Sequence, residues 1–102
     1  MNKLGIVERD GKTVGYLVRS PATEALLLFY TNPEFSPCVW TFNGDMERPT
    51  FSPSMLLHPD NIHGREHFFV RAGKIEYLQD CDHPMAGMTV DMVDVDGEEV
   101  DP

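Results

Sequence analysis

The sequence lacks any long hydrophobic run. Its longest uninterrupted apolar stretch is the six residues Ala25–Tyr30, whereas a helix needs about 20 apolar residues to span a membrane. The N-terminus lacks the apolar stretch of a secretory signal, and the two cysteines, Cys38 and Cys81, are too few for a disulfide framework. These absences argue against a membrane or a disulfide-rich secreted protein, and we expect the protein to act in the cytoplasm.

Basic residues are also scarce. The chain has 8 Lys and Arg against 17 Asp and Glu, for a net charge of −9. From residue 91 onward there are acids but no base: Asp91, Asp94, Asp96, Glu98, Glu99 and Asp101. Direct binding to nucleic acid is not expected, because no basic stripe is available to contact phosphates. The acidic end is either a solvated tail or a mimic of nucleic acid that occupies a basic groove of a protein partner.

Turn residues divide the chain into short segments that suit strands. Eight Gly and eight Pro are spread over 102 residues. Asp10-Gly11 lies between two alternating segments and is a strong signal for a two-residue hairpin. A second hairpin is predicted over residues 67–78, with Ala72-Gly73 at its turn. A two-residue turn places Val70 opposite Ile75 and Phe68 opposite Tyr77, and we assign these four side chains to the core.

The remaining segments complete a mainly β fold: a single-domain antiparallel sheet or sandwich built from hairpins, with at most one or two short helical turns. We expect this domain to cover residues 1–95, and residues 96–102 to form a flexible acidic tail. The other predicted elements are one helical turn at Ser20–Glu24, a strand at 38–42, an edge or bulged strand at 49–57, a mobile loop at 58–65 and a last strand at 88–93.

Residues whose side chains can bind a metal or take part in catalysis gather at the ends of the second hairpin. Glu66-His67 opens its first strand, and Asp80-Cys81-Asp82-His83 follows its second. Antiparallel pairing brings these ends together. A thiolate with one or two imidazoles is a ligand set that zinc prefers, and Asp80 or Asp82 could fix an imidazole tautomer. Zinc is therefore the cofactor to consider, with Glu66, His67, Cys81 and His83 as its candidate ligands.

Strand parity leaves alternatives open within this cluster. If the second strand continues through Cys81, that side chain lies on the Glu66 side, so Glu66, Cys81 and His83 are as reasonable a ligand set as one with His67. Cys81 can also be a small buried side chain without a metal, or pair with a histidine as a nucleophile. A reactive thiol requires a lowered pKa, which nearby Asp80 opposes.

Other signals are weaker. Cys38, beside Val39 and Trp40, could be a further ligand but is more typical of the core. His58 and His63 fall in the predicted loop and are expected to be solvated. The sequence has no glycine-rich phosphate loop, no Gly-x-Ser-x-Gly and no His-Glu-x-x-His.

Two stretches, Trp40–Ser54 and His67–Val90, resemble a small family of uncharacterised phage and prophage proteins that are commonly mislabelled "ammonia monooxygenase". The resemblance implies a small phage-type domain and supplies no activity. Many relatives carry a Cys-x-x-Cys knuckle and a further Cys before the histidine that matches His67, which implies a four-thiolate zinc site. Here those positions are Ser20, Thr23 and Glu66, so this member has either lost the metal or keeps a reduced site.

Without a complete catalytic motif, the sequence favours a non-enzymatic accessory or interaction protein that binds an unknown protein partner. A metal, if bound, would stabilise the fold. Two alternatives are an acidic inhibitor of a host nucleic-acid-binding or defence protein, and a small hydrolase that uses Cys81 with a histidine or a metal. A phage-encoded protein of this kind would act in the host cytoplasm.

Overall fold

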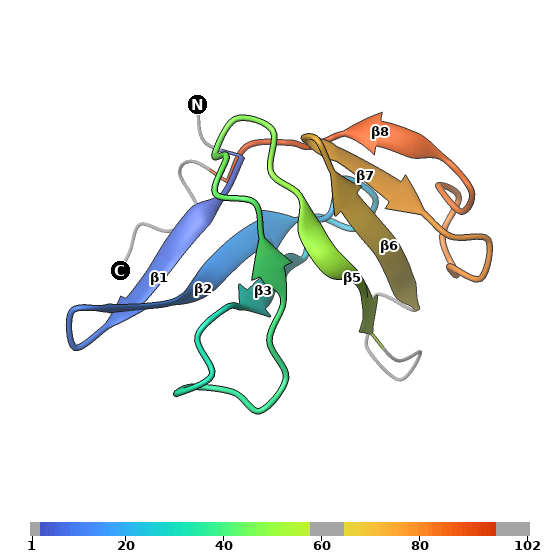
Figure 1. The fold of residues 1–102 in the computed structure, drawn as a ribbon. Coiled ribbons are helices and arrows are strands. Elements are labelled where there is room, and N and C mark those ends of the chain that lie inside the picture. Colours follow the sequence, from blue (N-terminus) through green and yellow to red (C-terminus); the bar gives the residue numbers. More distant parts are fainter. Residues whose placement is uncertain (1–2, 58–64, 96–102) are drawn as a thin grey trace.

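The computed structural model describes residues 3–57 and 65–95, which form two antiparallel sheets (Figure 1). The first sheet has the order β1-β2-β3, with β1 at Gly5–Arg9, β2 at Lys12–Arg19 and β3 at Leu26–Tyr30. The second has the order β4-β5-β6-β7-β8, with β4 at Thr41–Phe42, β5 at Phe51–Leu57, β6 at Glu66–Arg71, β7 at Lys74–Tyr77 and β8 at Thr89–Asp91. The predicted mainly β class is confirmed.

Both predicted hairpins are present, with the expected turns. Asp10 and Gly11 have φ values of 53° and 76°, and Ala72 and Gly73 have 48° and 79°. Positive φ at both central residues defines the turn that matches the right-handed twist of paired strands. In the second hairpin Val70 pairs with Ile75 and Phe68 with Tyr77, and all four side chains are buried, as predicted.

Aromatic side chains from both sheets meet between the layers. Phe29 of β3 stacks on Phe51 of β5 with ring centroids 4.6 Å apart, and Phe51 also stacks on Phe42 at 4.8 Å. Tyr16 of β2 lies 4.6 Å from Phe42, and Phe29 lies 6.3 Å from Phe68 of β6. Because Phe51 contacts rings from both sheets, β5 is fixed against the core at its first residue.

Strand β5 has an irregularity in its pairing with β6. Phe51 pairs with Val70, but Met55 pairs with Phe68, so three residues of β5 lie opposite one residue of β6. The bulge expected from the two prolines is therefore confirmed. Beyond it, Met55 is buried and Leu56 is 45% exposed. Alternation then places Ser54 on the outer face of the sheet.

Residues 20–24 form the expected single turn, closed by the hydrogen bond from the Glu24 N–H to the Ser20 carbonyl, and Glu24 ends it with a φ of 66°. Two predicted strands differ from the structure. The strand predicted at 38–42 is limited to β4, because the Trp40 N–H donates to Tyr30 of the other sheet. The strand predicted at 88–93 is the three residues of β8.

Some predictions concern residues outside the described ranges. These include most of the expected mobile loop, with His58 and His63, and the tail from residue 96 onward. Of the six acids near the C-terminus, the structure places only Asp91 and Asp94. Within residues 3–57 and 65–95 there is no helix, so the described residues contain none that is long and apolar enough to cross a membrane.

Candidate functional site

A serine, a histidine and an aspartate lie in series on the outer face of the larger sheet. Ser54 Oγ is 3.3 Å from Nε2 of His67, and Nδ1 of His67 is 3.1 Å from both carboxylate oxygens of Asp80. The three residues come from β5, from β6 and from the turn after β7. A hydroxyl, an imidazole and a carboxylate in this order form the arrangement that activates a serine nucleophile.

Strand register brings the serine to the histidine. Leu56 pairs directly with His67 across the β5–β6 ladder. Ser54 is two residues from Leu56 on the same face, which makes it a diagonal neighbour of His67. In Figure 1, β5 and β6 run side by side along this stretch. The distance of 3.3 Å is in the looser range that resting nucleophile–base pairs show.

The segment after β7 stays attached to the beginning of β6 and so carries Asp80 to the histidine. The Leu78 N–H donates to the His67 carbonyl at 2.9 Å, and the Asp82 N–H donates to the Arg65 carbonyl at 3.2 Å. In return, the Arg65 N–H donates to the Asp82 carboxylate at 2.9 Å. The two ends of the hairpin therefore meet, as the sequence predicted.

The charge on Asp80 suits the role of orienting the imidazole. The hydrogen bond from His67 lowers the pKa of the Asp80 carboxyl below its usual value, with a smaller contribution from the Arg65 guanidinium 3.4 Å away. Asp80 is therefore ionised at neutral pH and can only accept a hydrogen bond from Nδ1. The tautomer with its proton on Nδ1 leaves Nε2 free to take the proton of Ser54.

The opposite side of β6 carries a buried polar network. Glu66 is fully buried, and its carboxylate accepts hydrogen bonds from the hydroxyls of Ser20, at 2.9 Å, and Thr23. The Ser20 hydroxyl also lies 2.7 Å from the Tyr77 hydroxyl. These bonds satisfy a carboxylate that would otherwise be costly to bury. Ser20, Thr23 and Glu66, which the resemblance equates with ligand positions of relatives, thus come together in space.

His83 completes this network from the loop after β7. Its ring packs edge-on against Tyr77, with centroids 4.7 Å apart. The Met85 N–H donates to Nδ1 at 3.2 Å, so the ring proton of a neutral His83 is on Nε2. Nε2 lies 3.5 Å from the Glu66 carboxylate, a close approach that does not reach hydrogen-bond geometry.

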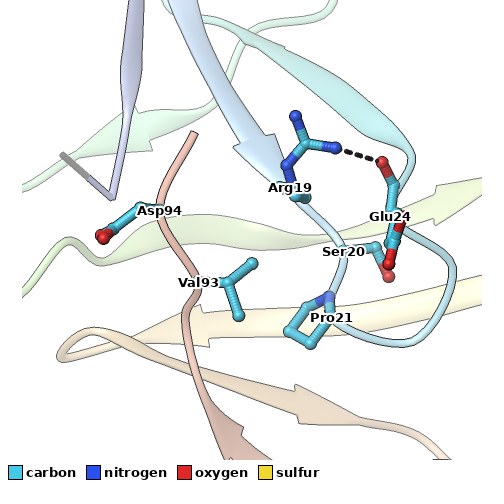
Figure 2. A pocket seen from close by; sticks show the side chains of 6 residues that line it. All are labelled: Arg19, Ser20, Pro21, Glu24, Val93 and Asp94. Atoms are coloured by element: carbon cyan, nitrogen blue, oxygen red, sulfur yellow. Dashed lines mark hydrogen bonds between the residues drawn. The ribbon is translucent and has the colours of Figure 1, made fainter. Parts of the chain in front are cut away.

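The turn that supplies Ser20 and Thr23 is held in place from its outer side. Figure 2 shows the Arg19 guanidinium bonded to the Glu24 carbonyl, a contact of 2.6 Å that closes the turn. Pro21 lies beside Val93 from the segment after β8, in the lining of a shallow pocket. The turn therefore presents its hydroxyls inward to Glu66 while its backbone is fixed at the surface.

Cys81 links the two sides of β6 through the backbone of His67. Its Sγ accepts a hydrogen bond from the His67 N–H at 3.4 Å and donates to the His67 carbonyl at 3.2 Å. Burial is the main cause that raises the pKa of the Cys81 thiol, and the charge of Asp80 adds to it. Cys81 is therefore a protonated thiol that holds the histidine strand. Cys38, expected in the core, is instead exposed.

The four candidate metal ligands are divided between these two sides. His67 uses both ring nitrogens in the outer arrangement, while Glu66, Cys81 and His83 lie toward the core, with the thiol protonated and bonded to backbone. Within residues 3–57 and 65–95, no group of three or more His, Cys, Asp and Glu side chains is arranged to hold a metal ion. We assign no chemical step to a metal.

Ser54 is not among the candidates that the sequence suggests, and Asp80 is there only a residue that could orient an imidazole beside a metal. Neither residue lies in a motif with fixed local spacing, because the three functional groups come from three separate segments. One signal was present: Ser54 follows Pro53 in a predicted bulged strand next in order to the strand of His67. Bulges are enriched beside active sites because they redirect a side chain.

Fold and site together define a small β protein with the serine–histidine–aspartate geometry of a serine hydrolase. The chain belongs to the family described as "Bacterial ubiquitination-like system serine protease (BubE)", whose sequence model matches residues 6–78. The match includes Ser54 and His67 and ends just before Asp80. Comparisons with curated proteins and with solved structures gave no match.

The buried network predicts a stability effect at Glu66. Glu66→Ala should lower the free energy of unfolding by about 3 kcal/mol or more, because it leaves buried hydroxyls without their acceptor and opens a cavity. Glu66→Gln keeps the shape and should cost about 1–2 kcal/mol. Urea denaturation measures both. Glu76→Ala, which removes an exposed ion pair with Arg71, is the control and should cost less than about 1 kcal/mol. Equal losses in Glu66→Ala and Glu76→Ala would contradict the role of the network.

The division of the candidate ligands predicts the outcome of elemental analysis. Protein purified without a histidine tag should contain less than stoichiometric zinc, and Cys81→Ser should contain the same amount. The reason is that Glu66 and Cys81 already bond to groups of the protein, while the His67 ring lies on the opposite side of β6. Stoichiometric zinc in the wild type that disappears in Cys81→Ser would establish a metal site at Cys81.

Proposed function

We propose that the protein is a serine protease that acts within a bacterial ubiquitination-like system. Ser54 is the nucleophile, His67 is the general base, and Asp80 orients and stabilises the imidazole. The observation that carries the proposal is the continuous series from Ser54 Oγ through both ring nitrogens of His67 to the Asp80 carboxylate. The description of the matching family as a serine protease supports the same class of reaction.

The reaction follows from the positions of the three groups. Ser54 Oγ attacks the carbonyl carbon of the scissile peptide bond while Nε2 of His67 takes the hydroxyl proton. The resulting imidazolium is stabilised by ionised Asp80 at Nδ1. His67 then donates its proton to the departing amine, which leaves an acyl ester on Ser54. Water, deprotonated by the same imidazole, hydrolyses this ester and restores the serine hydroxyl.

The structure favours serine over cysteine as the nucleophile. Cys81 has a raised thiol pKa and bonds to the backbone of His67, not to an imidazole nitrogen. A cysteine nucleophile needs a lowered pKa and a base within hydrogen-bond reach. The protein partner expected from the sequence would, in this proposal, be a substrate protein of the ubiquitination-like system.

A fluorophosphonate probe tests the nucleophile directly. The wild type should form one covalent adduct, which peptide mass spectrometry locates at Ser54, and Ser54→Ala should form none. Peptidase activity of Ser54→Ala should fall by about a thousandfold or more, since the attacking atom is removed. Ser52→Ala is the matched control, because Ser52 is an exposed serine of the same strand. An adduct that persists in Ser54→Ala, or is absent from the folded wild type, would refute the proposal.

Asp80→Asn tests the orienting carboxylate. It should lower kcat by about 100- to 10,000-fold, because an amide does not hold the Nδ1-protonated tautomer. Asp82→Asn keeps a side-chain oxygen that can accept the Arg65 N–H and removes no hydrogen bond to the His67 ring, so it should retain most of the activity. Equal losses in the two variants would indicate a loop defect and not loss of the carboxylate.

The lowered pKa of Asp80 also predicts a pH dependence. The pKa of Asp80 in the folded protein is below the unfolded value of about 3.9. The stabilisation of the folded site by ionised Asp80 is therefore complete above about pH 3.9. It is lost only as the pH falls through the lower folded pKa. Kcat–pH profiles of the wild type should therefore show no ionisation of Asp80 between about pH 5 and pH 8.

A further inference from the structure

An apolar groove begins beside the nucleophile. It has a volume of about 500 Å³ and lies between β3 and β5, with Leu26, Leu28, Trp40, Met55 and Leu56 among its lining residues. Met55 and Leu56 directly follow Ser54 in β5. The Trp40 indole N–H donates to the Ser54 carbonyl at 3.3 Å, so the wall of the groove is bonded to the backbone of the nucleophile itself.

The groove follows the edges of two strands. Side chains of consecutive strand residues point to opposite faces. Lining by the consecutive residues Leu26–Leu28 and Met55–Leu56 therefore means that the groove runs along the edge of each strand. In the described residues, β3 is the last strand of its sheet, and β4 pairs with β5 only at Phe51 and Ser52. Both walls thus present strand edge that no strand covers, and Trp40 bonds to one carbonyl on each, those of Tyr30 and Ser54.

The chemistry of the lining is uncharged. Charged residues make up 25% of the chain, but every residue that lines the groove is apolar, aromatic, serine or cysteine. Large apolar side chains are nevertheless left accessible there: Leu26 is 39% exposed, Leu56 is 45% exposed, and Val39, between two lining residues, is 40% exposed. An exposed apolar surface at a catalytic serine is typical of a site for the side chains of a substrate.

We propose that this groove binds the substrate as an extended peptide segment with apolar side chains, laid along the edge of β5 so that the scissile carbonyl reaches Ser54. This inference rests on the proposed protease function and adds its substrate class. Three features support an extended peptide over a compact ligand: the length of the groove along two strands, the uncovered strand edge, and the direct continuity with the nucleophile. Uncovered edges bind peptides in this way through backbone hydrogen bonds, while side-chain pockets supply specificity.

Leu26 is the residue at which to test the groove, because it is exposed and belongs to the sheet that holds none of the three catalytic groups. Leu26→Glu and Leu26→Lys should each lower kcat/KM for a fluorogenic peptide with leucine or phenylalanine beside the scissile bond, by about tenfold to a hundredfold. On peptides that carry lysine in place of this leucine or phenylalanine, Leu26→Glu should be more active than Leu26→Lys. Ile6→Glu is the matched control, since Ile6 is a 56% exposed apolar residue of β1 outside the groove.

Fluorophosphonate labelling of Ser54 separates this inference from the function on which it rests. The probe reports the nucleophile without requiring an extended peptide, so its rate in Leu26→Glu should equal that of the wild type. Normal labelling together with unchanged cleavage of apolar peptides by both Leu26 variants would refute the proposal that the groove binds the substrate. Absence of labelling in the wild type would overturn the protease itself. A loss of peptidase activity in Ile6→Glu equal to that in Leu26→Glu would also overturn the groove, since it would show a general effect of the added charge.

Discussion

The pairing register of β5 with β6 is the constraint on which the site depends. Met55 and Phe68 are paired and buried, so their neighbours Leu56 and His67 are directed outward together. A slip of one residue would turn His67 into the core and expose Phe68. The core therefore fixes the register, and the register places the imidazole within reach of Ser54. The bulge before Met55 adds two residues to β5, an even number, so Phe51 and Met55 keep the same face and Ser54 lies on the outer one.

The strand of His67 is held from both of its faces. On the inner face, buried Glu66 gathers hydroxyls from a turn that is more than forty residues earlier in the chain. The Cys81 thiol bonds both backbone groups of His67, and the Asp80 carboxylate holds the ring on the outer face. A catalytic imidazole must keep its orientation against thermal motion, and residues fixed by packing and hydrogen bonds achieve this best. The buried network around Glu66 and the contacts of Cys81 and Asp80 thus together hold His67 in its orientation.

The sequence predicted the fold better than the site because the two depend on different distances along the chain. The turns at Asp10-Gly11 and Ala72-Gly73 are set by adjacent residues, and the two-residue length of the second turn fixes the Val70–Ile75 pairing. The convergence of the hairpin ends followed from antiparallel geometry, which brought Asp80 and Cys81 to the start of β6. Ser54 could not be joined to them, since its position depends on the β5–β6 register and on a bulge whose extent the prolines do not specify. Strand parity already separated Glu66 and Cys81 from His67, but the residue types alone left open which histidine belongs with which carboxylate.

Under the proposed protease function, selectivity must come from outside Ser54, His67 and Asp80. His67 and Asp80 keep 24% and 43% of their side-chain surface accessible, so they do not enclose a substrate. Binding energy that orients the scissile bond must then come from contacts farther along the peptide, where it is converted into rate by fixing the attack geometry. The edge of β5 is suited to this because the strand that supplies Ser54 also forms one wall of the groove. The backbone of β5 would then position both the carbonyl of a bound peptide and the nucleophile Ser54, so no conformational change is needed to bring the two together.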